Sequence, residues 1–247
     1  MDISKQEYLE NVLSSYRMRH ISRLVEKHRT RRDEIKEYLE AHYGGKIYNP
    51  MNSGSFAKHT AINSKFDLDL VVPFKRDSFD TLEGMFKDIF KLLNAAYKNR
   101  AVVRKQKVSI GIEFYADNDG DEISIDVVPG RELEQDKYPD NYNLNLFVNS
   151  RYGTIEEKNF LKTNIKAQIE YIKARDNERK VIRLLKVWKN RHNRPYKSFL
   201  LELLTIKAFD DLTPRFIHLH LEVPAFFLLQ TYPEIHSVTS SLMNYAA

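Results

Sequence analysis

The spacing of apolar residues divides the chain into a long first helix, a set of strands and a helical second half. Over residues 4–43, apolar side chains recur every three or four positions, the spacing that gives a helix one buried face. Ser4 and Glu7 have the spacing of a capping box at its start, and Gly44 and Gly45 follow its end. The pattern predicts one continuous helix across these residues.

Residues 46–128 change to the two-residue alternation of strands, interrupted by one amphipathic helix. A short strand is expected at 46–51, and an apolar strand begins near residue 67. The amphipathic helix covers 79–98, and further strands fall within 102–128. This half of the chain therefore predicts a sheet packed against helices.

Residues 117–120, with the sequence Asp-Asn-Asp-Gly, predict the tip of a hairpin within the last group of strands. The acidic residues invite comparison with a calcium-binding loop. Aligning Gly120 with the glycine of such a loop puts Tyr115 at the first ligand position, and strands rather than helices flank the segment. The hairpin interpretation is the one that fits.

The second half returns to helical spacing after a polar stretch at 129–153, which predicts a loop leading into a short segment at 144–147. A capping box at 154–157 opens the first expected helix. That helix would bury one apolar stripe, formed by Leu161, Ile165, Ile169 and Ile172. A second helix includes residues 181–189, and a third begins near Ser198.

The length of 247 residues fits one large domain or two small, closely packed ones. We place the boundary near residue 150, which gives a lobe over 1–150 and a helical lobe over 151–247. The absence of cysteine excludes disulfides and thiolate metal sites. No apolar run approaches the ~20 residues of a membrane span, and the N-terminus lacks the apolar core of a signal peptide. We therefore expect a cytoplasmic protein with no membrane association.

The net charge of +5 suits a protein that binds triphosphates and is compatible with nucleic acid without requiring it. Basic residues are concentrated in the first predicted helix, over residues 16–32, but glutamates and aspartates lie among and after them. A solvated helix face and a nucleic-acid contact both fit this pattern.

Three aspartates carry the candidate chemistry. Asp67 and Asp69 lie two residues apart on a predicted strand, so their side chains point to the same face. Paired carboxylates repel each other unless a cation lies between them, and Mg²⁺ prefers such oxygen ligands together with substrate phosphates. Asp126 lies in a second apolar strand, and three carboxylates could hold two Mg²⁺ ions about 3.5–4 Å apart if the strands are neighbours. Upstream, the Gly54-Ser55 turn offers backbone N–H groups and a hydroxyl for an anion.

Gly54-Ser55, followed by Asp67-x-Asp69 and a later strand Asp126, resembles the motif of the polymerase β-like nucleotidyltransferases. The segments 181–189 and 197–202 are similar to the helical half of the cyclic GMP-AMP synthase and 2′-5′-oligoadenylate synthetase branch. The short chain most resembles the bacterial members, the CD-NTases of anti-phage signalling operons. The resemblance covers roughly residues 1–210. It implies a bilobal α+β fold with a mixed sheet, a long N-terminal spine helix and a helical lobe.

The resemblance also assigns roles to the site residues. Asp67, Asp69 and Asp126 would be the catalytic residues and the ligands of two Mg²⁺ or Mn²⁺ ions. Gly54 and Ser55 would bind the β- and γ-phosphates of a triphosphate.

The helical lobe would complete the substrate site. Lys186 and Ser198 would contact phosphate, and Phe199 would stack on a nucleobase. Two plainer interpretations stay open, in which Lys186 is a solvated helix lysine and Phe199 belongs to the core. Lys58 and His59, between the turn and the strand, are weaker candidates for phosphate contacts.

The implied reaction links NTP substrates, with release of pyrophosphate, into a cyclic di- or trinucleotide second messenger. This product would act on a downstream effector in anti-phage, CBASS-type signalling. A nucleic-acid activator on the basic spine helix is a further implied partner, because animal members of the branch use that helix in this way. The alternatives are nucleotidyl transfer to an RNA, protein or small-molecule acceptor, or a non-catalytic nucleic-acid-binding module.

Overall fold

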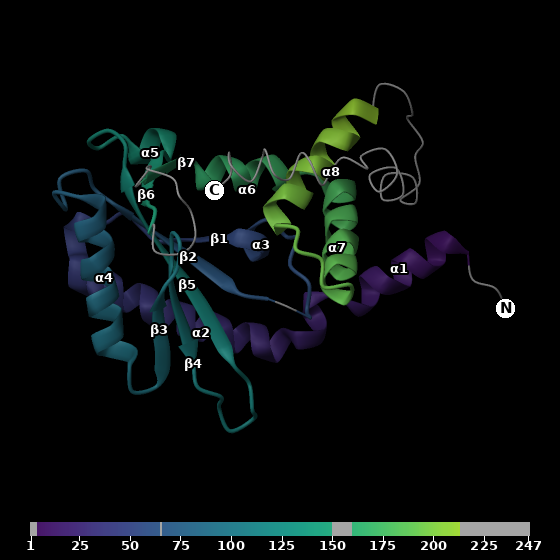
Figure 1. Ribbon diagram of the computed structural model, residues 1–247, viewed down its shortest axis with the longest axis horizontal. Helices are drawn as coiled ribbons and strands as arrows, with labels where there is room; N and C mark the ends of the chain where they lie inside the picture. Colours follow the sequence, from purple (N-terminus) through teal and green to yellow (C-terminus); the bar gives the residue numbers. More distant parts are fainter. Residues whose placement is uncertain (1–3, 65, 150–159, 213–247) are drawn as a thin grey trace. The chain divides into compact units, whose positions relative to one another are not determined.

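The structure is a computed structural model whose elements form two compact units (Figure 1). It describes three stretches of the chain, residues 4–64, 66–149 and 160–212. The sheet unit consists of Ile21–Lys58 and Phe66–Glu170. The helical unit consists of the described parts of Met1–His20, His59–Lys65 and Tyr171–Ala247. The lobe boundary expected near residue 150 stays a prediction, because residues 150–159 lie outside the described stretches.

The described strands of the sheet unit form one mixed sheet (Figure 1). Their bounds are β1 Met51–Ser53, β2 Leu68–Phe74, β3 Ala101–Lys105, β4 Ile110–Phe114, β5 Ile123–Glu132, β6 Leu144–Phe147 and β7 Phe160–Thr163. The order is β1-β2-β5-β4-β3, with β6 beside β5 and β7 beside β6. β2 and β5 pair in parallel at the centre, whereas the other pairings are antiparallel.

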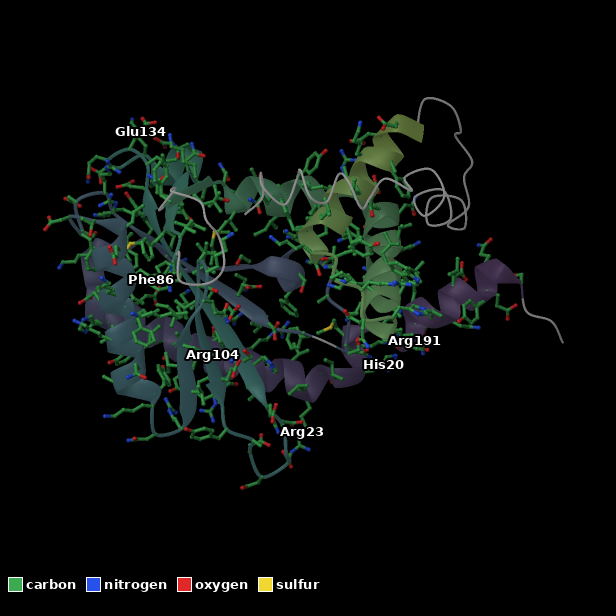
Figure 2. All side chains as sticks on the ribbon, viewed as in Figure 1. His20, Arg23, Phe86, Arg104, Glu134 and Arg191 are labelled. Atoms are coloured by element: carbon green, nitrogen blue, oxygen red, sulfur yellow. The ribbon has the colours of Figure 1, made fainter. Side chains whose placement is uncertain are left out.

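Two helices of the sheet unit, α2 and α4, cover one face of this sheet. The described α-helices are α1 Lys5–Ser15, α2 Ser22–Tyr43, α3 Gly54–Ala57, α4 Leu82–Tyr97, α5 Tyr138–Asn141, α6 Ile165–Lys173, α7 Asp176–Arg191 and α8 Ser198–Leu212. Leu39 of α2 and Ile89 of α4 share a buried core with Leu70 of β2. Phe86 of α4, labelled in Figure 2, is 1% exposed, and its ring lies 5.3 Å from that of Phe147. Burying this apolar surface is the main stabilising contribution to the unit.

The opposite face of the sheet carries a smaller apolar cluster around Val71 and Val128, which contacts Tyr138 of α5 and the strand β6. Because successive strand residues point to opposite faces, Asp69 and Asp126 share this second face with Val71 and Val128. The core side of the sheet is thus filled, and the chemistry-bearing residues lie on the other side.

The continuous helix expected over residues 4–43 is wrong, because it divides into α1 and α2 with a 3-10 turn, η1 Met18–Ile21, between them. The carbonyl groups freed at the end of α1 find other donors. The side chain of Asn63 donates to the Ser15 carbonyl at 3.0 Å, and the Asn63 backbone N–H donates to that of Tyr16 at 3.3 Å. His20 contacts the carbonyl of Ser14 at 2.9 Å. These tertiary bonds are invisible to a helical pattern.

The helix expected from residue 154 is also corrected within the described part of the chain. Leu161 lies in strand β7, which pairs with β6, and α6 begins at Ile165. The helix has its own cap, because the Asn164 side chain accepts a hydrogen bond from the Ala167 N–H at 2.9 Å. The proposed capping box at 154–157 lies outside the described residues.

The loop expected from residue 129 begins later, because β5 continues through Pro129 to Glu132. Pairing with β4 ends at Val127, and pairing with β6 starts at Gly130. Pro129 lies between the residues of β5 that pair with β4 and those that pair with β6. Proline has no backbone N–H, and on this side of β5 no neighbouring strand needs one from it.

Other predicted elements are confirmed with shifted ends. The helix expected at 79–98 is α4, which starts at Leu82 after a Thr81 cap. The strand expected at 46–51 is an exception, because it shares only Met51 with β1 Met51–Ser53. The two later helices are α7 and α8. Within the described residues no helix combines the length and apolar character needed to cross a bilayer.

Candidate active site

The sheet unit brings Asp69 and Asp126 together on the two central strands. Asp69 of β2 is in register with Asp126 of β5, so their Cα atoms are paired across the parallel ladder. Leu68 and Leu70, which flank Asp69, are buried in the core, and so are Ile125 and Val127, which flank Asp126. This alternation turns both aspartates to the opposite face. The two strands are neighbours, which is the condition for a site shared by these aspartates. Asp67 immediately precedes β2 and has an exposed side chain.

Burial and mutual repulsion make this pair difficult to ionise. Burial raises the pKa of Asp69 to about 7, the charges of Asp126 and Asp67 add to that rise, and Lys58 opposes it. Burial likewise raises the pKa of Asp126, with a further contribution from Asp67, while hydrogen bonding from Gln106 opposes it. Adjacent carboxylates in this state are stabilised by a cation between them. Their hard oxygen donors fit Mg²⁺ or Mn²⁺.

Gly54 lies so close to Asp69 that a side chain would not fit there. Its φ of +65° is in the left-handed region, and a Cβ atom at this position would be 1.6 Å from Asp69 Oδ2. The preceding Ser53 pairs with Asp69 across the β1–β2 ladder. Ser55 is part of α3, the single helical turn that Gly54 begins. The Gly54-Ser55 bend therefore adjoins an aspartate of the predicted triad, and its phosphate-binding role stays a prediction.

A hydrogen-bonded partner of Asp126 was not found from the sequence. The side chain of Gln106 donates to Asp126 Oδ1 at 3.0 Å, and Ser109 Oγ donates to Gln106 Oε1 at 2.6 Å. Gln106 reaches Asp126 from the turn between β3 and β4. Periodicity carries no signal for a contact made from a turn.

The predicted substrate residues of the helical unit are partnered within that unit. Lys186 is 5% exposed, and its ammonium donates to Glu202 and to the Thr60 hydroxyl, both at 2.8 Å. It is therefore not the solvated lysine that was one interpretation. Ser198, the first residue of α8, accepts a hydrogen bond from Lys189 at 3.0 Å. Phe199 is half-buried, and the proposed contacts of Lys186, Ser198 and Phe199 with nucleotide stay predictions.

The weaker candidates Lys58 and His59 lie in different units. Lys58 is buried. Burial, Asp126 and Asp67 raise the pKa of Asp69, and the positive charge of Lys58 partly offsets this rise. The carbonyl group of His59 accepts a hydrogen bond from Arg183 at 3.0 Å, and its ring contacts Arg179 at 3.1 Å. Neither residue has a role in phosphate binding established by these contacts.

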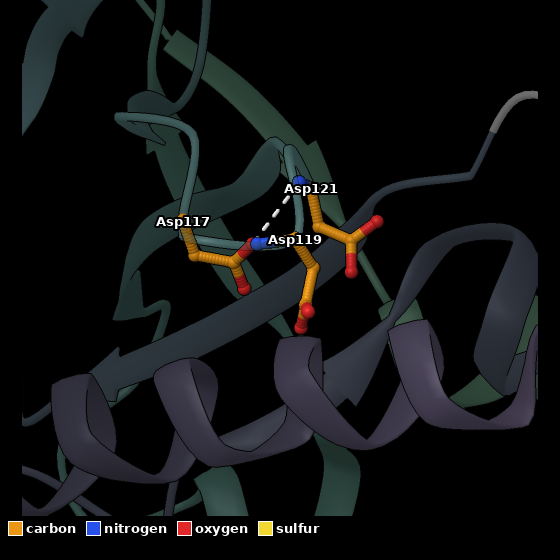
Figure 3. A group of neighbouring side chains, drawn as sticks. All are labelled: Asp117, Asp119 and Asp121. Atoms are coloured by element: carbon orange, nitrogen blue, oxygen red, sulfur yellow. Dashed lines mark hydrogen bonds between the residues drawn. The ribbon is translucent and has the colours of Figure 1, made fainter.

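A second group of aspartates lies at the predicted hairpin tip (Figure 3). One carboxylate oxygen from each of its three aspartates lies within 4.8 Å of the other two. Within the described residues, the predicted metal ligands Asp67, Asp69 and Asp126 do not meet this criterion. Lys27 of α2 donates to all three of its carboxylates at 2.6–2.7 Å, and these are Asp117, Asp119 and Asp121. The Lys27 ammonium group thus contributes one positive charge shared by the three carboxylates.

A family model described as the Second Messenger Oligonucleotide or Dinucleotide Synthetase domain matches residues 3–174. A cyclic AMP-AMP-AMP synthase of Escherichia coli (strain MS 115-1) is 28% identical over 192 residues, which cover 72% of this chain and 56% of the relative. The chain thus spans about half the length of the curated relatives it matches, with 56% and 50% covered.

Solved structures agree with this relationship. The structure of CdnC from E. coli MS115-1 in complex with HORMA-deltaN is 25% identical, with a TM-score of 0.54 over 75% of this chain and 58% of the other. The CdnE cyclic dinucleotide synthase of Elizabethkingia meningoseptica, solved with GTP and Apcpp, has a TM-score of 0.61 at 15% identity, covering 81% of this chain and 74% of the other. The second likeness shows the shared fold.

Proposed function

The chain belongs to the family of Second Messenger Oligonucleotide or Dinucleotide Synthetase domains, and we propose that it joins NTPs into a cyclic di- or trinucleotide with release of pyrophosphate. The observation that carries this proposal is the pairing of Asp69 with Asp126 on adjacent strands, directly against the Gly54 bend. A binding module gains nothing from two half-buried carboxylates that raise each other's energy. The names of the relatives, a cyclic AMP-AMP-AMP synthase and a CBASS oligonucleotide cyclase, support the same reaction class.

Each turnover would form a bond from a ribose hydroxyl oxygen of one nucleotide to the α-phosphorus of another. The bond from that phosphorus to the pyrophosphate oxygen breaks. Asp67, Asp69 and Asp126 would hold two Mg²⁺ or Mn²⁺ ions, which when bound neutralise charge on the attacking and leaving oxygens. Asp126 would also accept the hydroxyl proton as the general base.

The remaining residues would bind and orient the nucleotides. The backbone of Gly54 and the hydroxyl of Ser55 would receive the β- and γ-phosphates. Lys186 and Ser198 would add phosphate contacts, and Phe199 would stack on a base. Repeated transfer on the bound linear product would close the ring, after two transfers for a dinucleotide and three for a trinucleotide. The released product would act on an effector protein in anti-phage signalling.

Incubation with each labelled NTP, in Mg²⁺ and in Mn²⁺, tests this function. We expect phosphatase-resistant products from the wild-type chain and none from Asp69→Asn. Asp117→Asn is the matched control, because it makes the same chemical change in the other acidic cluster, and it should retain activity. Label that appears only on an added RNA, protein or small-molecule acceptor would replace this proposal with acceptor transfer. Equal product from Asp69→Asn and wild type would overturn the assigned site.

Nucleic acid on the basic first helix is a separate proposal with weaker support. Arg29, Arg31 and Arg32 of α2 each form an ion pair with an acidic residue of the same helix. This pairing favours a solvated helix face over a phosphate-binding surface. Activation by nucleic acid would show as a salt-sensitive rise in product when DNA or RNA is added, and an unchanged rate would exclude it.

A further inference from the structure

We propose that Gln106 is a positioning residue that fixes the orientation of the Asp126 carboxylate. The inference rests on the proposed function, because orientation of this carboxylate matters only where Asp126 ligates a metal ion and accepts a proton. Gln106 does not contact substrate in this scheme. It would act through Asp126.

The hydrogen bonds around Gln106 have a fixed direction. An ionised carboxylate only accepts hydrogen bonds, so Asp126 Oδ1 selects the amide nitrogen of Gln106 as its donor, at 3.0 Å. The amide oxygen of Gln106 then faces Ser109, whose hydroxyl donates to it at 2.6 Å. The chain of donors runs from Ser109 through Gln106 to Asp126, and reversing the amide would break both bonds.

The local backbone is arranged to hold this chain. Gln106 and Ser109 are also joined by a backbone hydrogen bond, in which the Gln106 N–H donates to the Ser109 carbonyl at 2.8 Å, so the turn between β3 and β4 sets their spacing. Gly111 is in register with Asp126 on the neighbouring strand. A Cβ atom at Gly111 would lie 2.6 Å from Gln106 Nε2 and 3.3 Å from Asp126 Oδ1. Glycine at this position leaves the space in which the amide reaches the carboxylate.

A neutral donor is the appropriate partner for a metal ligand. The nearby cation Arg104, labelled in Figure 2, forms its ion pair with Glu113. If an arginine formed an ion pair with Asp126, it would neutralise the negative charge of the carboxylate and so weaken its attraction for a divalent cation. An amide holds one oxygen in place, keeps the carboxylate anionic and leaves Oδ2 to ligate the ion. Partners of this kind orient metal-ligating carboxylates, and their loss typically reduces metal affinity or activity about 10–100-fold.

Manganese binding and steady-state kinetics together test the inference. Gln106→Met keeps the length of the side chain and removes the amide. We expect it to weaken Mn²⁺ binding, followed by electron paramagnetic resonance, by about tenfold. At a fixed, subsaturating Mn²⁺ concentration the apparent kcat should fall by a similar factor, while the KM for NTP changes less than twofold, since no nucleotide contact is lost. Ser109→Ala should reproduce a smaller part of both effects, because it frees the amide to rotate.

Three comparisons make the outcome decisive. Gln168→Met is the matched control, because the amide it removes donates to Thr163 and to no aspartate, and it should leave Mn²⁺ binding unchanged. Excess Mn²⁺ should restore activity to Gln106→Met but not to Asp126→Ala. If Gln106→Met is folded, as judged by its thermal transition, and binds Mn²⁺ as wild type does, Gln106 has no positioning role. Absence of any product from wild type together with weakened Mn²⁺ binding in Gln106→Met would instead contradict the proposed function and leave this inference standing.

Discussion

Gly54 is the glycine, among those that the structure describes, at which an added Cβ atom would make the closest contact. An alanine there would need a φ of +65° and would place Cβ 1.6 Å from Asp69 Oδ2, so the carboxylate must move. We expect Gly54→Ala to reduce product formation by about 100-fold, the effect of a misplacement of about 1 Å in a catalytic site. The measurement is the initial rate with labelled NTPs at saturating Mn²⁺.

Gly120→Ala is the control for the backbone strain alone. Gly120 has a φ of +77°, but an added Cβ atom there meets nothing within 4 Å. The strain should lower the free energy of unfolding by about 1–2 kcal/mol and leave the rate unchanged. Equal loss of rate in both variants would mean that strain, rather than the contact with Asp69, explains the effect.

Glu132 is a buried carboxylate whose charge is held by hydrogen bonds. Burial alone would raise its pKa, but the backbone N–H groups of Arg76, Asp136 and Tyr138 and the Tyr48 hydroxyl outweigh burial and lower it. A carboxylate with a lowered folded-state pKa stabilises the protein above its unfolded pKa of about 4.3, and this stability is lost as the pH falls through the lower folded value.

Glu132→Gln should therefore flatten the acid side of the stability profile. At pH 7 the variant should lose about 1–3 kcal/mol of unfolding free energy, because a neutral amide accepts less well and brings donors that have no acceptor there. Below pH 4 the difference from wild type should shrink. Urea unfolding at a series of pH values measures both, and a difference that grows towards acid pH would contradict the assignment.

At the scale of elements, the β4–β5 hairpin is fastened to α2 by one lysine. Lys27 contacts three aspartates at the hairpin tip, whereas Arg23 of the same helix, labelled in Figure 2, contacts Asp119 from a side chain that is 77% exposed. Lys27→Met would leave the three carboxylates facing one another. We expect it to lower the thermal midpoint more than Arg23→Met, with the difference reduced in high salt, because exposed charges are screened. A midpoint equal to that of Arg23→Met would show that the contacts contribute nothing.

Elements defined by an apolar stripe could be predicted from the sequence, and elements defined by tertiary partners could not. Helices α4, α7 and α8 bury one face each, and the alternation around Asp67 and Asp126 was sufficient to predict two strands. That these strands pair with each other is known only from the structure. The break after α1 depends on Asn63, almost fifty residues later in the chain, which accounts for the wrong continuous helix. Strand β7 exists because β6 offers it an edge, which has no signature within residues 160–163 themselves.

The same distinction applies within the site. Asp69 and Gly54 were identified because each belongs to a local motif with a strand behind it. Gln106 was missed, since its contact with Asp126 depends on a turn and on the space left by Gly111. This contact forms only when the turn that carries Gln106, strand β4 and strand β5 are brought together in the fold.

At the scale of the whole molecule, the helical unit is assembled from three separate parts of the chain. The short segment His59–Lys65 joins it through Thr60, which lies between Lys186 of α7 and Glu202 of α8. All three side chains are buried, with Lys186 and Glu202 forming an ion pair of 2.8 Å. This network fastens the segment that precedes Asp67 to the two principal helices of the unit.

Lys186 therefore has a structural partner as well as a proposed phosphate contact, and stability separates the two roles. Lys186→Met removes the cation that compensates the buried charge of Glu202, which should cost about 3–5 kcal/mol in urea unfolding. The double variant Lys186→Met with Glu202→Leu removes both charges and should be more stable than Lys186→Met alone. The double variant thus regains stability but still lacks the ammonium group that would bind phosphate. If Lys186 binds phosphate, the double variant should have a KM for NTP raised about tenfold, the effect of one lost charged contact of ~1.4 kcal/mol. A wild-type KM in a stable double variant would leave Lys186 with its structural role alone.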